Sequence, residues 1–143
     1  MWTPRAALPL ALLLAACQAA ERPDVALRRD FGAVEVNRIG DFHPAYADYE
    51  DIAVLNALHL AVRRGVPKEA LEVATVAPSG PGGHGGGAAQ LPQGMPNYYE
   101  VWLRVAGCDP LIYMKASFTG RLFSVRDKGG CLKSAAAPTA KIY

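Results

Sequence analysis

The chain has 143 residues, and its 15 Lys and Arg residues nearly balance its 13 Asp and Glu residues, for a formal net charge of +2 at pH 7. This length is enough for one domain and short for two. The near balance of charge gives no basic face or stripe of the kind that nucleic-acid binding needs, so we expect no nucleic-acid partner.

The first residues have the layout of a secretory signal. Arg5 lies beside the free amine, an uncharged apolar run follows from Ala6 to Leu14, and small residues come next. This run of nine residues is too short for a transmembrane helix, which needs about 20. Residues 1–16 are therefore predicted to be a signal peptide.

The signal ends in an aliphatic residue, two small residues and a cysteine. This sequence, Leu14-Ala15-Ala16-Cys17, resembles the lipobox of bacterial prolipoproteins. The resemblance implies that Cys17 receives a diacylglyceryl thioether, becomes the mature N-terminus and anchors the protein in a membrane. Each CH₂ of a buried acyl chain contributes about 0.8 kcal/mol to membrane binding. Two or more acyl chains therefore anchor a protein stably, whereas a single chain binds the membrane reversibly.

The alternative is an ordinary cleavable signal, cut after Ala19 or Ala20, with Cys17 discarded. Among lipoproteins of enteric bacteria, an Asp directly after the cysteine favours the inner membrane, and Gln18 occupies that place here. We therefore expect a bacterial envelope protein, lipid-anchored in the outer membrane and facing the periplasm.

Residues 17–30 are small or polar and include one proline, and they are predicted to form a tether between the lipid and a single folded domain, residues 31–133. A short strand is predicted within residues 31–39, where Val34 and Val36 alternate with polar residues.

The clearest helix signal covers residues 45–65. Asp48 can cap its start, basic residues fall in its last turn, and Gly65 favours a C-terminal cap. Helical spacing predicts one apolar side that faces the core, formed by Ile52, Leu55, Leu58 and Val62. A helical turn from Pro67 and a strand over residues 71–76 are predicted to follow.

Residues 78–96 are rich in glycine and proline and are predicted to form a flexible loop. His84 lies in the middle of this loop, where glycine backbone groups and an imidazole could bind a copper or nickel ion. His43, two residues after Asp41, is a second weak candidate for a metal ligand or an acid–base group. Neither histidine has a visible ligand set or nucleophile beside it, so no metal site is predicted.

The last third of the domain predicts a three-stranded antiparallel meander over residues 98–108, 111–118 and 121–127, with a turn at residues 108–110. Because the first and third strands run in the same direction, Cys108 and Cys131 are expected at the same end of the sheet.

Cys108 and Cys131 form an even pair in an exported domain, and a disulfide is the simplest state of such a pair in an oxidising compartment. Closing this loop would stabilise the domain by about 3 kcal/mol. A zinc site would need further ligands, and the spacing is not that of a C-x-x-C redox motif.

Trp102 lies between Glu100 and Arg104 on one face of the first meander strand. This setting is typical of an exposed anchor residue that contacts a partner. Cover from the N-terminal strand or from the tail, residues 134–143, would instead make Trp102 part of the core, and burial is the favoured interpretation. The tail has no periodicity and is expected to be loose.

Together these signals predict an α+β fold, in which one main helix packs on a sheet of four or five antiparallel strands that ends in the meander. No catalytic or cofactor motif is found in the sequence, so we expect no enzyme activity and no cofactor. The expected function is that of a small anchored lipoprotein that binds another envelope protein or has a structural role.

Two alternatives stay open. One is an envelope assembly factor or inhibitor, because the order of elements resembles the small lipoprotein of the β-barrel assembly machinery in topology alone, and topology does not determine function. The other is a protein that binds a metal or a small ligand through His84 or His43.

Overall fold

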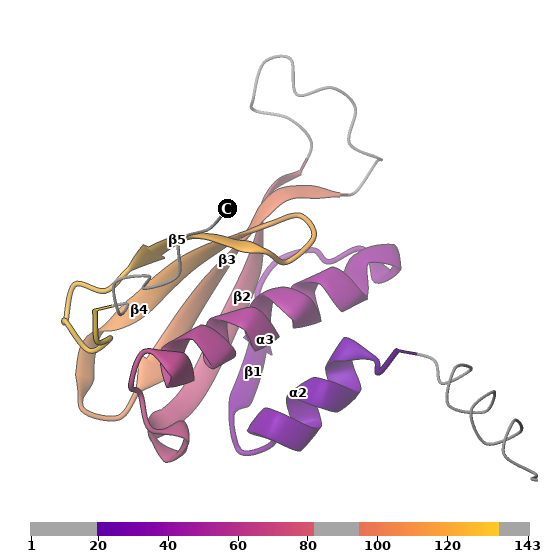
Figure 1. The fold of residues 1–143 in the computed structure, drawn as a ribbon. Coiled ribbons are helices and arrows are strands. Elements are labelled where there is room, and N and C mark those ends of the chain that lie inside the picture. The colour runs from indigo at the N-terminus through magenta and orange to yellow at the C-terminus, as the bar shows by residue number, and fades with distance from the viewer. Residues whose placement is uncertain (1–19, 82–94, 135–143) are drawn as a thin grey trace, which may run out of the picture.

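The computed structural model describes residues 20–81 and 95–134 (Figure 1). The signal peptide and the lipobox with Cys17, the middle of the predicted loop with His84, and all but the first residue of the tail lie outside the described residues.

Five strands form a single sheet in the order β1-β2-β3-β4-β5. Their bounds are β1 Glu35–Arg38, β2 Leu71–Pro81, β3 Pro96–Val105, β4 Cys108–Ser117 and β5 Leu122–Arg126. The predicted α+β fold is confirmed, and the last three strands are the predicted antiparallel meander.

The sheet is mixed, because β1 pairs in parallel with β2. The prediction of a purely antiparallel sheet is therefore wrong at this edge. The reason lies in the chain path: β1 is followed by the long helix α3, Ala47–Arg63, which carries the chain back across the sheet before β2 begins (Figure 1). A helical crossover of this kind joins parallel strands, whereas a short hairpin joins antiparallel ones.

Helix α3 covers one face of the sheet and buries Ala53, Val54, Ala57, Leu58 and Ala61. The predicted apolar side is confirmed only for Leu58: Ile52 and Leu55 are half-buried, and Val62 is exposed. The buried side is rich in alanine, and these small side chains let the helix axis approach both the sheet and a second helix closely. The helix begins at Ala47, so Asp48 lies in the first turn and is not the cap.

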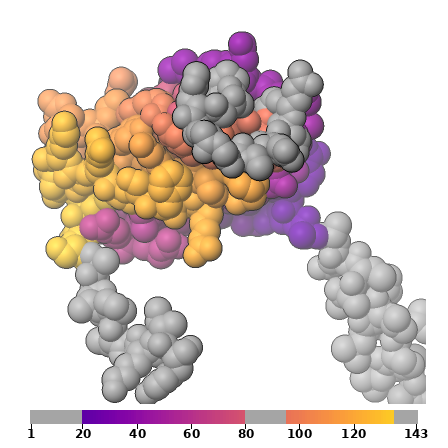
Figure 2. Space-filling model, turned by 90° about the horizontal axis from the view of Figure 1, so that it is seen from above, coloured from indigo at the N-terminus to yellow at the C-terminus, as the bar shows by residue number. Residues whose placement is uncertain are grey.

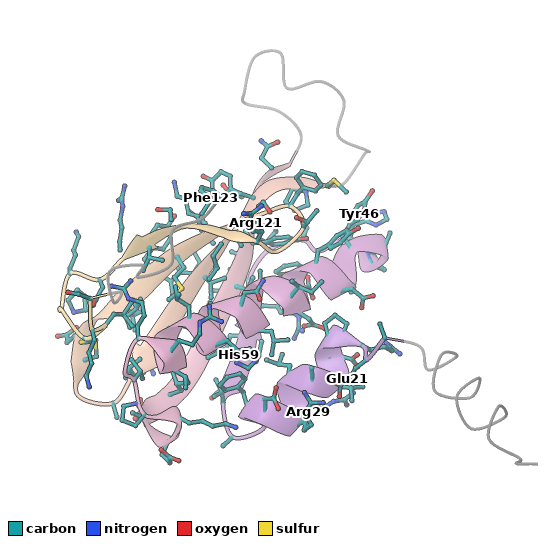
Figure 3. All side chains as sticks on the ribbon, in the orientation of Figure 1. Glu21, Arg29, Tyr46, His59, Arg121 and Phe123 are labelled. Carbon is teal, nitrogen blue, oxygen red and sulfur yellow. A yellow bond between two sulfur atoms is a disulfide. The ribbon has the colours of Figure 1, made fainter. Side chains whose placement is uncertain are left out.

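That second helix, α2, covers Pro23–Phe31. Pro23 stands in the first turn, where a missing N–H costs nothing, and Leu27 and Phe31 are buried against the core. The ring of Phe31 contacts His59 of α3 with a centroid distance of 4.9 Å, and Figure 3 shows His59 between the two helices. The tether predicted over residues 17–30 is therefore wrong from Pro23 onward, because this segment has its own apolar stripe and packs as part of the domain.

Strands β2 and β3 extend into the segment predicted as a flexible loop. Pro78 pairs with Tyr99, and Pro81 pairs with Pro96. The loop prediction is thus wrong at residues 78–81 and at Pro96. By this point β1 has ended, so one side of β2 has no partner strand among the described residues, and prolines are tolerated at such an unpaired edge.

The first turn of the meander lies at Ala106 and Gly107 and begins two residues before the predicted turn at residues 108–110. Gly107 has a φ of 76°, which a tight hairpin requires and which glycine adopts without strain. As a result β4 begins at Cys108.

Cys108 is disulfide-bonded to Cys131, with the two Cα atoms 6.0 Å apart, in agreement with the prediction. The residues after the disulfide return to α3, where the backbone N–H of Lys133 donates to the carbonyl of Arg64 at 2.7 Å. The disulfide and α2 lie at opposite ends of the molecule, and the view at right angles in Figure 2 shows the same separation, with α2 in indigo and the last described residues in yellow.

Within residues 20–81 and 95–134, none of the helices combines the length and the apolar character that crossing a membrane requires.

Candidate protein-binding face

The face of the sheet opposite α3 is not covered by any described helix (Figure 1). Along β3, Tyr99, Val101, Leu103 and Val105 are buried toward the helices, so the alternate residues point to the other side. We call this other side the outer face and define it by Tyr98, Glu100, Trp102, Arg104, Leu111, Tyr113, Lys115, Phe123 and Arg126.

Trp102 lies in the centre of the outer face. It stands directly opposite Tyr113 of β4 in the strand register, and the two rings contact each other at a centroid distance of 5.5 Å. Trp102 is half-buried, between the fully buried core residue and the exposed anchor that the sequence allowed. Of the two segments that could have covered it, the N-terminal strand pairs at the edge of the sheet, as β1, and the tail after residue 134 lies outside the described residues.

A hollow of about 540 Å³ lies beside these two rings. Its lining residues are Glu100, Trp102, Pro110, Leu111, Tyr113, Arg126 and Lys128. The Tyr113 hydroxyl donates a hydrogen bond to Glu100 Oε1 at 2.5 Å, and burial together with this hydrogen bond raises the pKa of Tyr113 to about 12. Glu100 is therefore already engaged, and the charges left at the rim of the hollow are the cations Arg126 and Lys128.

A second aromatic pair extends the outer face toward β5. The rings of Tyr98 and Phe123 meet edge to face at 6.3 Å, and Lys115 Nζ lies 5.0 Å from the centroid of the Tyr98 ring. Phe123 is 60% exposed and Leu111 is 42% exposed, and Figure 3 shows Phe123 on the side of β5 away from α3. Large, rigid and partly exposed aromatic side chains beside arginine are the residue types that contribute most to protein–protein binding.

A different cluster joins β1 to α3 inside the molecule. Arg38 pairs with both Glu50 and Asp51, with Arg38 Nε 2.6 Å from Glu50 Oε1. The two carboxylate side chains are 6% and 7% exposed, whereas Arg38 is 39% exposed. Burial raises the pKa of Glu50 and of Asp51 above their ordinary values.

A cleft of about 310 Å³ between α2 and β1 reaches this cluster through Arg38 and Asp51. Its other lining residues, all within the described part of the chain, include no serine, threonine, cysteine or histidine that could act as a nucleophile or base. The ion pairs of Arg38 join β1 to the first turns of α3.

The raised pKa of Glu50 leads to a testable pH dependence. A carboxyl group whose pKa is higher in the folded state contributes stability below its unfolded pKa and loses that contribution as the pH rises. We expect the stability of the wild type relative to Glu50→Gln to increase as the pH falls from 7 toward 4. Urea unfolding at several pH values measures this difference, with Glu69→Gln as the surface control. A difference that does not vary with pH would contradict the assignment.

Of the histidines predicted as weak metal candidates, the structure describes His43. It caps the short helix η1, Pro44–Tyr46, where its Nδ1 accepts a hydrogen bond from the Ala45 N–H at 3.1 Å. Among the described residues, His43 belongs to no group of three possible metal ligands. One such group, Cys108, Asp127 and Cys131, does exist, but its two sulfur atoms are bonded to each other.

Comparison with known protein families, curated proteins and solved structures finds no match to this chain.

Sequence reasoning identified Trp102 but missed its partners Tyr113 and Leu111. Residues alternate between the two faces of a strand, so the predicted strand over residues 111–118 has Ile112 and Met114 on one face and Leu111 and Tyr113 on the other, and this alternation could have identified both partners. The cluster around Arg38 had no such signal, because Arg38 lies 12 residues from Glu50 in the sequence.

Proposed function

We propose that this protein is a lipid-anchored component of the bacterial envelope that binds another envelope protein through its outer face. The proposed role is binding, and the proposed location is the periplasmic side of the outer membrane. The observation that carries the proposal is the half-buried pair Trp102 and Tyr113 beside a hollow on a sheet face that no described segment covers.

Three features support the proposal. The lipobox ending at Cys17 supports the anchor. The disulfide between Cys108 and Cys131 is typical of an oxidising compartment such as the periplasm. The outer face combines aromatic side chains with cations at its rim, the composition found at the centre of many protein interfaces.

The anchor can be tested by measuring the intact mass of the mature protein from its native membrane. The proposal expects a chain that begins at Cys17 and carries fatty acids, and it expects a gain of two hydrogen atoms on reduction of the disulfide. A native chain that begins after Cys17 and carries no lipid would remove the anchor from the proposal.

The binding face can be tested by site-specific photo-crosslinking in cells. A photoreactive amino acid at Leu111 is expected to capture a defined partner, whereas the same group at Val62, an exposed apolar position on α3, is expected to capture none. Equal labelling from both positions would argue against the outer face as the binding surface.

Once that partner is identified, Trp102→Ala is expected to weaken its binding. Truncation of a central aromatic anchor costs about 2 kcal/mol or more, which corresponds to a roughly 30-fold increase in Kd. Titration calorimetry with the purified partner measures the change, and Val62→Ala serves as the control for loss of an exposed apolar side chain. An unchanged Kd for Trp102→Ala would exclude Trp102 as the anchor.

A further inference from the structure

The start of α2 limits how far the folded body can move from a lipid attached at Cys17. Helix α2 begins at Pro23 and is packed into the body through Leu27 and Phe31. Only residues 18–22 separate it from Cys17. An extended chain spans at most about 3.3–3.6 Å per residue, so this spacer reaches about 20 Å at most. This inference rests on the proposed lipid anchor.

The beginning of α2 lies at a definite end of the molecule. In Figures 1 and 3 the N-terminal ends of α2 and α3 lie on the same side, marked by the labelled residues Glu21 and Tyr46. The disulfide lies at the opposite end, and Figure 2 shows the same arrangement from above. A spacer of about 20 Å keeps the first end near the bilayer and leaves the disulfide end farther away.

The first end also carries surface residues that suit a headgroup layer. Ile39 is 59% exposed and Val25 is 42% exposed. At the start of α3, on the same side of the molecule, Tyr46 stacks on Tyr49 with a centroid distance of 6.4 Å. Tyrosine rings are enriched at membrane–water interfaces, because one end of the side chain is apolar and the other is hydrated.

We infer that this end of the molecule, defined by Val25, Ile39, Tyr46 and Tyr49, faces the phospholipid headgroups of the membrane that holds the anchor. The same end carries the acidic residues Glu21, Asp41 and Asp48, and its basic residue Arg22 is paired with Asp24, so attraction between basic residues and anionic lipids is not the basis of the orientation. In this orientation the disulfide end points away from the membrane. The outer face, which extends between the two ends, stays free for a partner.

Energy transfer from tryptophan to a dansyl-labelled headgroup lipid tests the orientation. Trp102 is the single tryptophan after Cys17, so Trp102→Phe gives a background without tryptophan in the mature chain. In this background Ile39→Trp places a donor at the inferred membrane-facing end, and Lys128→Trp places one near the disulfide. The acylated full-length mature proteins are reconstituted into vesicles of zwitterionic phospholipid that contain the dansyl lipid.

We expect a transfer efficiency at least twofold higher from Ile39→Trp than from Lys128→Trp. Inserting ten Gly and Ser residues after Ala20 should reduce this ratio, because a flexible linker of n residues adds about 5–6 Å × √n to the mean reach. Equal efficiencies, or a higher efficiency from Lys128→Trp, would overturn the orientation. Thermal unfolding checks that both variants are folded, and Val25→Trp replaces Ile39→Trp if the latter is not.

The intact mass of each sample is measured first. A chain without lipid would refute the anchor of the proposed function, and with it this orientation, but not the binding role of the outer face. A correctly acylated chain with equal transfer from both positions would refute the orientation alone.

Discussion

Arg38→Ala is expected to lower the free energy of unfolding at pH 7 by about 2–4 kcal/mol. The substitution leaves Glu50 and Asp51 buried without their shared cation, and removing one partner of a buried ion pair typically costs 3–5 kcal/mol. The lower range expected here reflects the partial exposure of Arg38, which lets water reach the cluster. Urea unfolding followed by circular dichroism measures the change.

Arg28→Ala is the matched control for this prediction. Arg28 pairs with Asp24 within α2, and its side chain is 75% exposed, so its loss should cost no more than about 0.5 kcal/mol. The destabilisation by Arg38→Ala should also become smaller as the pH falls, because the carboxyl groups of Glu50 and Asp51, whose pKa values are raised by burial, then become neutral. Equal effects of the two substitutions would show that the Arg38 cluster does not hold β1 to α3.

Replacing both Cys108 and Cys131 with serine is expected to lower the free energy of unfolding by about 3 kcal/mol. The disulfide closes a loop with a sequence separation of 23 residues, and a cross-link over such a loop restricts the unfolded chain by about this amount. Removing the cross-link increases the conformational entropy of the unfolded chain and does not change the folded structure. The folded variant should therefore keep the circular dichroism spectrum of the wild type.

The control for the serine variant is the wild-type protein with its disulfide reduced. Reduced wild type and the double variant should unfold at the same urea concentration, and oxidised wild type at a higher one. If oxidised and reduced wild type unfolded together, the disulfide would not contribute to stability.

The meander could be predicted because its signals are local. Alternating apolar residues define the buried face of each strand, as with Val101 and Leu103 in β3. The strand order then follows from short turns, and two strands that run in the same direction bring Cys108 and Cys131 to one end of the sheet. The turn begins two residues earlier than predicted, because the positive φ of Gly107 determines the position of the hairpin and Pro110 does not.

The helical layer was harder to predict, because its burial depends on contacts between distant segments. Ala53, Ala57 and Ala61 are only weakly hydrophobic, so they stand out little in a sequence pattern. They are nevertheless fully buried on the side of α3 that packs against the core. Similarly, α2 is too short and too highly charged to be stable alone. It is helical here because Leu27 and Phe31 are buried against the rest of the core.

The amino-acid sequence by itself determined the main helix, the meander and the disulfide pairing. It also led to the prediction of export and a lipid anchor. Each of these depends on residues near one another in the chain or on a short motif. The parallel edge strand, the docking of α2, the pairing of Arg38 with two carboxylates and the partial exposure of Trp102 were decided only by the tertiary structure. They depend on contacts between segments that are distant in the sequence, and local sequence patterns do not specify such contacts.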